Sequence, residues 1–218
     1  SGGPNADTLR GLGIGVDVLG ARGPGLPAAA LRLALIARRE APDAVQGWMY
    51  HGDLAALATR PFLPRGARVF WGIRASDMDL DRYGRLIGLC ARLSRWPDAV
   101  IANSRAGAEA HRARGYAATA WRVIPNGIDV ARFRPDPGTR AARRAALAFA
   151  QDTIVATHVA RVDAMMDHAT LIAAMAEAPG ITFLLAGAGT ETLDLPPNAR
   201  ALGRVADPEA VYAAADIV

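Results

Sequence analysis

Two stretches of the sequence decide the fold: Trp121-Arg-Val-Ile-Pro-Asn-Gly-Ile-Asp-Val-Ala-Arg-Phe133 and His158-Val-Ala-Arg-Val-Asp163. In the first, a short β run stops at Pro125, and Asn126-Gly127 follows, two residue types that adopt positive φ at low cost. In the second, Arg161 comes at the carboxyl end of another strand. We interpret the pair as the crossing from one α/β domain into another. Because ligands of open α/β sheets bind outside the carboxyl ends of the strands, the sequence predicts a site for an anionic ligand in a cleft between two domains.

Strand and helix patterns alternate along the rest of the chain, which predicts parallel βαβ units. The predicted strands are 14–19, 44–47, 68–73, 99–103, 121–124, 153–159, 181–186 and 200–202. The predicted helices are 27–40, 51–60, 81–94, one from the N-cap Ser104 to about Gly115, 139–148, 167–178 and 207–214. This pattern divides the chain into a first domain at 1–124, a linker at 125–152 and a second domain at 153–218.

The composition is that of a globular protein with a core: 218 residues, 51% of them hydrophobic. All 25 cationic residues are arginine, and the net charge is +4. Two explanations for the missing lysine stay open, a GC-rich coding sequence and phosphate recognition by the planar guanidinium. The arginines are scattered along helices without interleaved aromatic residues, which argues against nucleic acid binding. The lone cysteine, Cys90, is expected to be a buried, inert thiol of a cytosolic protein, and no run reaches the length of a membrane span.

Arg161 is the principal candidate for ligand binding. It comes two residues after a predicted strand, and Asp167 is placed to cap the helix that follows. A diphosphate there would receive a bidentate arginine and the positive end of a helix dipole. The alternative is an arginine in an interdomain salt bridge.

The glycine-rich run Gly187-Ala-Gly-Thr190 also follows a strand but does not fit a dinucleotide fingerprint. That fingerprint requires a helix next, whereas Leu195-Pro196-Pro197 prevents one of useful length. We expect instead a tight turn that exposes its backbone to a base or a ribose.

A second set of candidates follows the strands of the first domain. His51 lies just past one strand, beside Trp48 and Tyr50, while Arg74 and Asp77 follow the next strand and are expected on the same rim. A packed or capping role for His51 is the alternative. No metal site is predicted, because His111, His158 and His168 are isolated in the sequence.

Six motifs in register carry a resemblance to a known family. They are Trp48-Met-Tyr-His51-Gly-Asp53, Val100-Ile-Ala-Asn-Ser104, Val123-Ile-Pro-Asn-Gly-Ile-Asp129, Ala160-Arg161-Val-Asp163 with Asp167-His168, Phe183-Leu-Leu-Ala-Gly187, and Leu202-Gly-Arg-Val205 with Val211-Tyr-Ala-Ala-Ala-Asp216. The chain resembles the retaining, two-domain glycosyltransferases of family 4, which have the GT-B fold. Two segments, Trp48-Met-Tyr-His51-Gly-Asp53-Leu and Val69-Phe-Trp-Gly-Ile-Arg74, resemble members that build capsular, exopolysaccharide or other envelope glycans.

The resemblance implies an α/β fold of two Rossmann-like domains with parallel sheets facing a cleft, and a metal-independent glycosyl transfer that retains anomeric configuration. The donor would be a nucleotide-diphosphate sugar, with no other cofactor. By the same resemblance, Arg161 would bind the donor diphosphate, Gly187 would lie under the nucleotide, and the backbone of Arg204 and Val205 would contact the base. His51 would lie near the donor sugar and the acceptor, which the first domain would bind.

The sequence departs from the family pattern in three places. The family pairs its arginine with a lysine five residues later, where this chain has Met166. The family's glycine-rich loop would precede Ser1, and its glutamate-rich donor loop would follow Val218, so both domains are expected to be incomplete. A non-catalytic nucleotide-sugar-binding or scaffolding relative is therefore the alternative to an enzyme. The expected location is the cytoplasm. The net charge of the chain permits a lipid-linked acceptor at the inner face of the membrane but is too small to argue for one.

Overall fold

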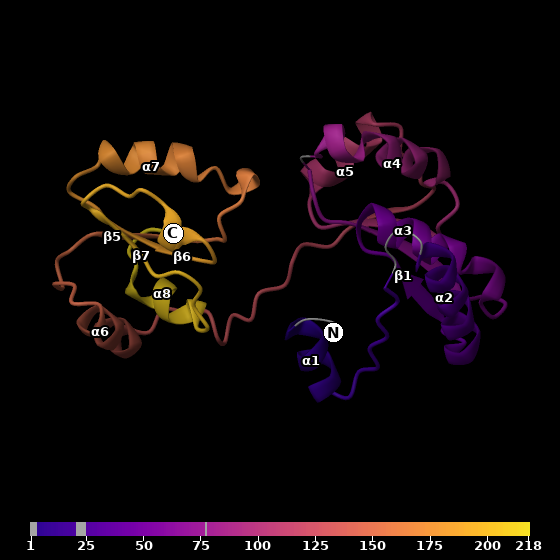
Figure 1. Ribbon diagram of the computed structural model, residues 1–218, viewed down its shortest axis with the longest axis horizontal. Helices are drawn as coiled ribbons and strands as arrows, with labels where there is room; N and C mark the ends of the chain where they lie inside the picture. Colours follow the sequence, from indigo (N-terminus) through magenta and orange to yellow (C-terminus); the bar gives the residue numbers. More distant parts are fainter. Residues whose placement is uncertain (1–3, 21–24, 77) are drawn as a thin grey trace. The chain divides into compact units, whose positions relative to one another are not determined.

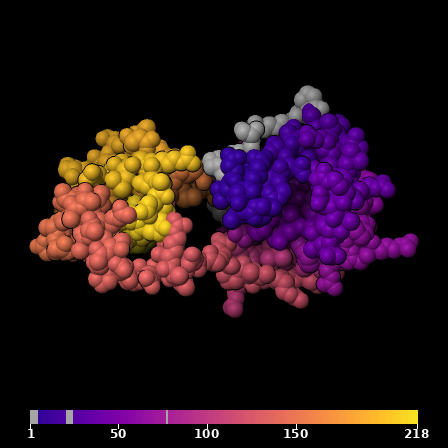
Figure 2. Space-filling view, turned by 90° about the horizontal axis from the view of Figure 1, so that it is seen from below, coloured from indigo at the N-terminus to yellow at the C-terminus, as the bar shows by residue number. Residues whose placement is uncertain are grey.

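The computed structural model describes residues 4–20, 25–76 and 78–218. The chain forms two compact units, Ser1–Asn126 and Gly127–Val218. It passes from the first unit to the second between Asn126 and Gly127 (Figures 1 and 2). The turn predicted at these two residues is wrong, because the segment 124–129 forms no turn and neither residue has a positive φ.

The first unit is built on a parallel sheet with the order β1-β2-β3-β4. Its strands are β1 (Ala44–Gln46), β2 (Arg68–Ile73), β3 (Ala99–Ala102) and β4 (Trp121–Val123). Its helices are α1 (Pro4–Gly11), α2 (Leu26–Glu40), α3 (Met49–Ala58), α4 (Leu80–Leu93) and α5 (Arg105–Ala113), with a 3₁₀ turn, η2, at Arg60–Phe62. The predicted βαβ alternation is confirmed.

The core of this unit lies under β2 and β3. The side chains of Val69, Trp71, Ile73 and Val100 are fully buried, which fits continuous apolar strands in the middle of a parallel sheet. Cys90 is also fully buried, as predicted, and burial raises the pKa of its thiol to about 11.

Helix ends in this unit are fixed by side-chain caps that the sequence signals. Ser104, as predicted, accepts a hydrogen bond from the Gly107 amide at 3.0 Å at the start of α5. Asp79 caps α4 by accepting from the Arg82 amide at 3.1 Å.

The strand predicted at 14–19 is wrong. That segment is extended without strand pairing, and Ile14 and Val18 are about half exposed. An alternating apolar pattern forms a strand only where a neighbour completes the ladder, and no described segment pairs with this one.

The second unit has a parallel sheet with the order β5-β6-β7. Its strands are β5 (Val155–Val159), β6 (Thr182–Ala186) and β7 (Ala199–Ala201); its helices are α6 (Pro137–Ala146), α7 (His168–Ala176) and α8 (Pro208–Ala214), with 3₁₀ turns η3 (Ala164–Met166) and η4 (Thr190–Thr192). On the other side of β5, Ile217 forms a parallel bridge with Ala156. Helix α7 covers one face of the sheet, and α6 and α8 lie over the other (Figure 1).

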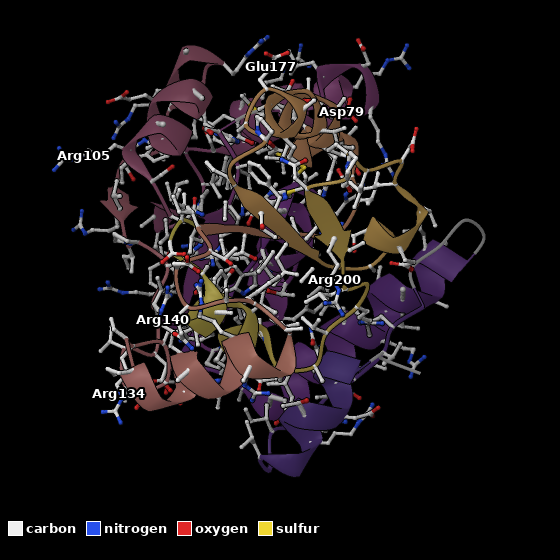
Figure 3. All side chains as sticks on the ribbon, turned by 90° about the vertical axis from the view of Figure 1, so that its left-hand side faces the viewer. Asp79, Arg105, Arg134, Arg140, Glu177 and Arg200 are labelled. Carbon is white, nitrogen blue, oxygen red and sulfur yellow. The ribbon has the colours of Figure 1, made fainter. Side chains whose placement is uncertain are left out.

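Helix α6, which the sequence placed in the linker 125–152, is attached to the second unit by arginines. The guanidinium of Arg144 is fully buried and donates to the carbonyl oxygens of Ala214 at 3.0 Å and Ala150 at 2.9 Å. Arg140, labelled in Figure 3, donates to the Asp216 carboxylate at 2.5 Å. A buried cation with several acceptors therefore joins α6 to the segment after α8.

No helix in the described part of the chain is both long and apolar enough to cross a membrane.

Candidate functional site

The second unit has a topological switch point at β5. Strand β6 pairs with one edge of β5, the bridge at Ile217 lies on the other, and the helices that follow β5 and β7 cover opposite faces of the sheet. In open α/β sheets the ligand crevice lies at the carboxyl ends of the strands at such a point. The loop after β5, which carries Arg161, is therefore the expected binding loop.

Arg161 is exposed and pairs with an acid on its own loop. Its Nε and Nη2 both donate to Asp163 Oδ2, at 3.2 and 3.0 Å, and its side chain is 64% exposed. The Met165 amide and then the Arg161 guanidinium hold the pKa of the Asp163 carboxyl below its usual value. The ion pair joins neighbouring residues, unlike the interdomain salt bridge considered from the sequence. Because an exposed pair of this kind is weak, an incoming phosphate could take the guanidinium from Asp163 at little cost.

The N-terminus of α7 follows this loop closely. Asp167 caps the helix as predicted, accepting from the Thr170 amide at 3.3 Å, and its backbone adopts the left-handed conformation with φ 44°. Just before it, the η3 turn exposes Met165 and Met166, with 67% and 37% of their surface open. Met166 thus presents a thioether, a weak acceptor without charge, where the family pattern has a cation.

Three loops at the carboxyl ends of β5, β6 and β7 form one cluster, residues 160–163, 187–190 and 202–205, which we call the three-loop cluster. The Val162 amide donates to the Ala188 carbonyl at 2.9 Å, and the Gly187 amide donates to the Gly203 carbonyl at 2.7 Å. The fully buried Thr190 hydroxyl accepts from the Gly203 amide at 3.1 Å. The cluster is therefore held by backbone hydrogen bonds and by the Thr190 hydroxyl.

Glycine is required at Gly187. Its φ is +147°, and a Cβ there would overlap the carbonyl group of Ala160. The neighbouring Gly189 also has positive φ, at +90°. The sequence interpretation of 187–190 as a tight turn rather than a dinucleotide fingerprint is confirmed, because only the short η4 turn follows it.

Arg204 and Val205 complete the three-loop cluster. The Arg204 side chain is exposed, whereas Val205 is half-buried against the apolar core of this unit. The structure thus brings the predicted residues Arg161, Gly187 and Arg204 to loops at one edge of one sheet, and Met166 to the start of the adjoining helix.

A histidine pair below this edge was missed by the sequence analysis. His158 on β5 and His168 on α7, which are separated in the sequence, meet in the structure with ring centroids 5.1 Å apart. His168 is 6% exposed, and neither of its ring nitrogens has a hydrogen-bond partner among the described residues. Burial, then the neighbouring His168, lowers the pKa of His158. Their positions at a strand end and a helix start were the available signal.

Candidate residues of the first unit follow β1 and β2, at the carboxyl edge of its sheet. His51 is exposed on α3, and its ring lies edge-on to Tyr83 with centroids 6.1 Å apart. Tyr50 is buried, and its hydroxyl lies 3.2 Å from His111 Nε2. His51 is therefore not a packed core residue, while its neighbour Tyr50 is.

Arg74 lies over the ring of Trp48, with the guanidinium carbon 4.8 Å from the ring centroid. This stack joins the end of β2 to the start of α3 and was also not foreseen. Asp77, the other predicted residue of this rim, lies outside the described residues.

The start of α3 is held against β2 by a buried carboxylate. Asp53 is fully buried and accepts from the Gly72 amide at 2.9 Å, while its second oxygen has no hydrogen-bond partner among the described residues. Burial raises the pKa of Asp53 to about 7. The backbones meet closely, since a Cβ on Gly47 would lie 2.5 Å from the Asp53 Cα and one on Gly72 would lie 2.7 Å from the Gly47 oxygen.

Within the described residues, no group of three or more His, Cys, Asp or Glu side chains is arranged to hold a metal ion.

The profile of Glycosyltransferase Family 4 matches residues 3–132, more than half of the chain. No curated protein matches the chain in sequence.

Among solved structures, HepE from Anabaena in complex with UDP-glucose is similar, with a TM-score of 0.79 and 21% identity over 96% of this chain. A glycosyltransferase from Rickettsia africae ESF-5 has a TM-score of 0.73 and 14% identity over 99% of the chain. Sucrose-phosphate synthase from Thermosynechococcus elongatus has a TM-score of 0.69 and 19% identity over 88%.

The chain spans 61%, 61% and 53% of these three proteins, respectively. Their similarity supports the predicted fold, an α/β architecture of the GT-B type with a parallel sheet in each unit. Together with the match to the family profile, it leads to one assignment: the chain belongs to Glycosyltransferase Family 4.

Proposed function

We propose that the protein transfers a sugar from a nucleotide-diphosphate donor to a glycan or lipid-linked acceptor, with retention of anomeric configuration. The observation that carries the proposal is the exposed guanidinium of Arg161 at the switch point of the second unit's sheet. A planar cation at that place suits a diphosphate, the group that a nucleotide sugar presents between its two halves.

In the proposed reaction, Arg161 exchanges Asp163 for the donor diphosphate. As the bond from the sugar to the diphosphate breaks, negative charge grows on the leaving group, and a guanidinium already in position stabilises that charge more than the ground state. The positive end of the α7 dipole adds to this field. This supports electrostatic catalysis without a metal ion.

The other residues of the three-loop cluster would hold the nucleotide. Gly187, which lacks a side chain, lets a ligand approach the backbone, and the backbone of Arg204 and Val205 would contact the base. In the first unit, His51 would act near the donor sugar and the acceptor, and Arg74 and Asp77 would bind the acceptor.

The donor proposed for the first tests is a UDP-sugar. HepE from Anabaena, which shares the fold, has been solved with UDP-glucose and with UDP and glucose. We propose that the reaction takes place in the cytoplasm, at the inner face of the membrane where the acceptor is lipid-linked, and contributes to polysaccharide biosynthesis.

Met166 favours the second candidate function, a non-catalytic nucleotide-sugar-binding or scaffolding protein. A missing cation at the diphosphate would remove a charge-assisted contact to the transition state, which typically lowers rates by about 10²–10³. Binding and catalysis must therefore be tested separately.

The test is calorimetric titration of UDP and GDP, then of UDP-glucose, into the wild type and three variants. Arg161→Ala should weaken UDP binding about tenfold or more, because it removes a charge-assisted contact. Met166→Lys should tighten UDP binding by a similar factor. The matched control is Met165→Lys, which adds the same charge at the adjacent, more exposed position and should change little.

Equal UDP affinity in the wild type and Arg161→Ala would overturn the proposed donor site. Tighter binding in both lysine variants would indicate a general charge effect rather than a phosphate clamp. Sugar transfer by Met166→Lys but not by the wild type, with UDP bound by both, would favour the non-catalytic function for the natural chain.

A further inference from the structure

We propose that Trp48 and Arg74 form a binding surface for an acidic sugar, one that carries a carboxylate or phosphate group on or beside its ring. The inference rests on the proposed function in one respect: the acidic sugar would be the acceptor or its terminal unit. The binding surface itself is argued from the first unit alone.

The two side chains come from loops at the carboxyl ends of adjacent parallel strands. Trp48 follows β1 and Arg74 follows β2, so both lie at the sheet edge where ligands of α/β folds bind. Trp48 is 54% exposed, whereas Trp71, on the neighbouring strand, is completely buried. An indole at a ligand-binding edge that is not used by the core is available for contact with a ligand.

The position of the indole is fixed before any ligand binds. A Cβ on Gly72 would lie 3.4 Å from Trp48 Cε3, so the Cε3 edge of the ring lies close to the β2 backbone. The Asp53 carboxylate on α3 accepts a hydrogen bond from the amide of the same Gly72, which joins the helix to β2. The backbone between them includes Met49 with φ 61°, a conformation that a non-glycine residue adopts only when its surroundings impose it. A surface held in this way loses little conformational entropy on binding.

The guanidinium of Arg74 lies over the Trp48 ring and pairs with no acid among the described residues. Its contact with Trp48 is a cation–π stack, and among the described residues it forms no salt bridge. Other arginines of this unit do, as Arg60 does with Asp98 at 3.2 Å. A guanidinium that lies over an aromatic ring still has N–H groups at its rim, and these can bind both oxygens of a carboxylate or phosphate.

The pair therefore offers the exposed part of an indole and a planar cation that lies over the same ring. The C–H face of a pyranose packs on an aromatic ring through dispersion and burial of apolar surface. A neutral sugar would use only that face, and an inorganic anion would use only the guanidinium. An acidic sugar uses both, which is the basis of the assignment.

The experiment compares three probes by saturation-transfer NMR and calorimetry on the intact protein: methyl β-glucuronide, glucose 1-phosphate and the neutral methyl β-glucoside. We expect both acidic probes to bind more tightly than the glucoside. The ratio of their affinities distinguishes a carboxylate from a phosphate as the preferred group. Trp48→Ala should weaken the binding of all three probes.

The main variant is Arg74→Ala, which should weaken both acidic probes about tenfold or more and leave the glucoside unchanged. Arg74→Lys keeps the charge but loses the planar fork, so its affinity for the acidic probes should lie between those of the wild type and Arg74→Ala. The matched control is Arg112→Ala. Arg112 also stacks on a tryptophan, Trp121, at 4.6 Å, but at the amino end of β4, so its removal should change nothing.

Equal affinity of the wild type and Arg74→Ala for the acidic probes would overturn the inference, as would equal affinity of the wild type for acidic and neutral probes. UDP titrations of the same proteins separate the two proposals. UDP binding without acidic-sugar binding would overturn only the inference. Acidic-sugar binding that depends on Arg74, in a protein that does not bind UDP, would keep the binding surface but overturn its role as an acceptor site.

Discussion

Replacing Arg144 by methionine should destabilise the second unit strongly, although the change keeps most of the side chain's volume. Arg144 is fully buried on α6, and its two terminal nitrogens donate to the carbonyl oxygens of Ala150, Thr153 and Ala214, to the Asp216 carboxylate and, at 3.4 Å, to the Gln151 carbonyl. Methionine donates no hydrogen bond, so these carbonyl groups would lose their cationic partner.

The expected cost follows from which acceptors keep another partner. The Ala150 carbonyl also accepts from the Thr153 amide at 3.3 Å. Asp216 keeps the Arg140 guanidinium at 2.5 Å and the Val155 amide at 2.8 Å, so its charge stays compensated. The main loss is therefore that of the charge-assisted bonds to the carbonyl groups, each worth about 1.5–3 kcal/mol, with partial replacement by water. We expect a decrease of about 3–5 kcal/mol in the free energy of unfolding, which corresponds to the loss of about two such bonds.

The neighbouring Arg143 provides the control. Its side chain is 46% exposed and forms a single salt bridge, to Asp207 at 2.9 Å. Arg143→Met should therefore cost less than about 1 kcal/mol. Both substitutions remove one charge from the same helix, so they differ mainly in burial.

Urea unfolding followed by two signals tests this prediction. All four tryptophans lie in the first unit, so their fluorescence reports that unit, whereas far-UV circular dichroism reports both. Arg144→Met should lower the dichroism midpoint of the second unit and leave the fluorescence midpoint unchanged. A loss below about 1 kcal/mol, equal to that of Arg143→Met, would refute the account of Arg144 as the residue that joins α6 to this unit.

Three further predictions follow. Gly187→Ala should destabilise the second unit by at least about 2 kcal/mol, because the new Cβ meets the Ala160 carbonyl, whereas Gly180→Ala, with open space around it, should not; thermal melts compare the two. The first unit should lose up to about 4 kcal/mol of stability as pH rises from about 4 to about 7, because burial raises the folded-state pKa of Asp53 to about 7. The Asp53→Asn variant should not show this loss of stability between pH 4 and 7. Parallel pH–stability curves for the wild type and the variant would exclude the raised pKa of Asp53 as its cause. Cys90, with its buried thiol of pKa about 11, should react with Ellman's reagent at pH 8 only on unfolding, and rapid reaction of the native protein would contradict its burial.

The sequence predicted the parts of the fold that depend on local chemistry. The caps at Ser104 and Asp167, the turn at Gly187 and the strand before Arg161 follow from residue types that favour one backbone conformation. The strand at 14–19 failed, because pairing depends on a neighbour that a periodic pattern cannot supply.

The candidate site was predictable only in part. Arg161 was placed by its position after a strand, which is a local property. The stack of Arg74 on Trp48 and the contact of His158 with His168 join residues from separate elements, so they depend on how strands and helices pack. Arg144 was counted only among the arginines scattered along helices, since composition does not reveal which cation is buried.

The backbone bonding of the three-loop cluster has a consequence for engineering. The loops are positioned by amide–carbonyl bonds and by glycines, while the side chains of Met165, Met166, Ala188 and Arg204 are exposed and take no part in that bonding. Recognition at this edge can therefore be altered separately from folding. A combinatorial library at these four positions would vary the chemistry presented to a ligand on an unchanged scaffold.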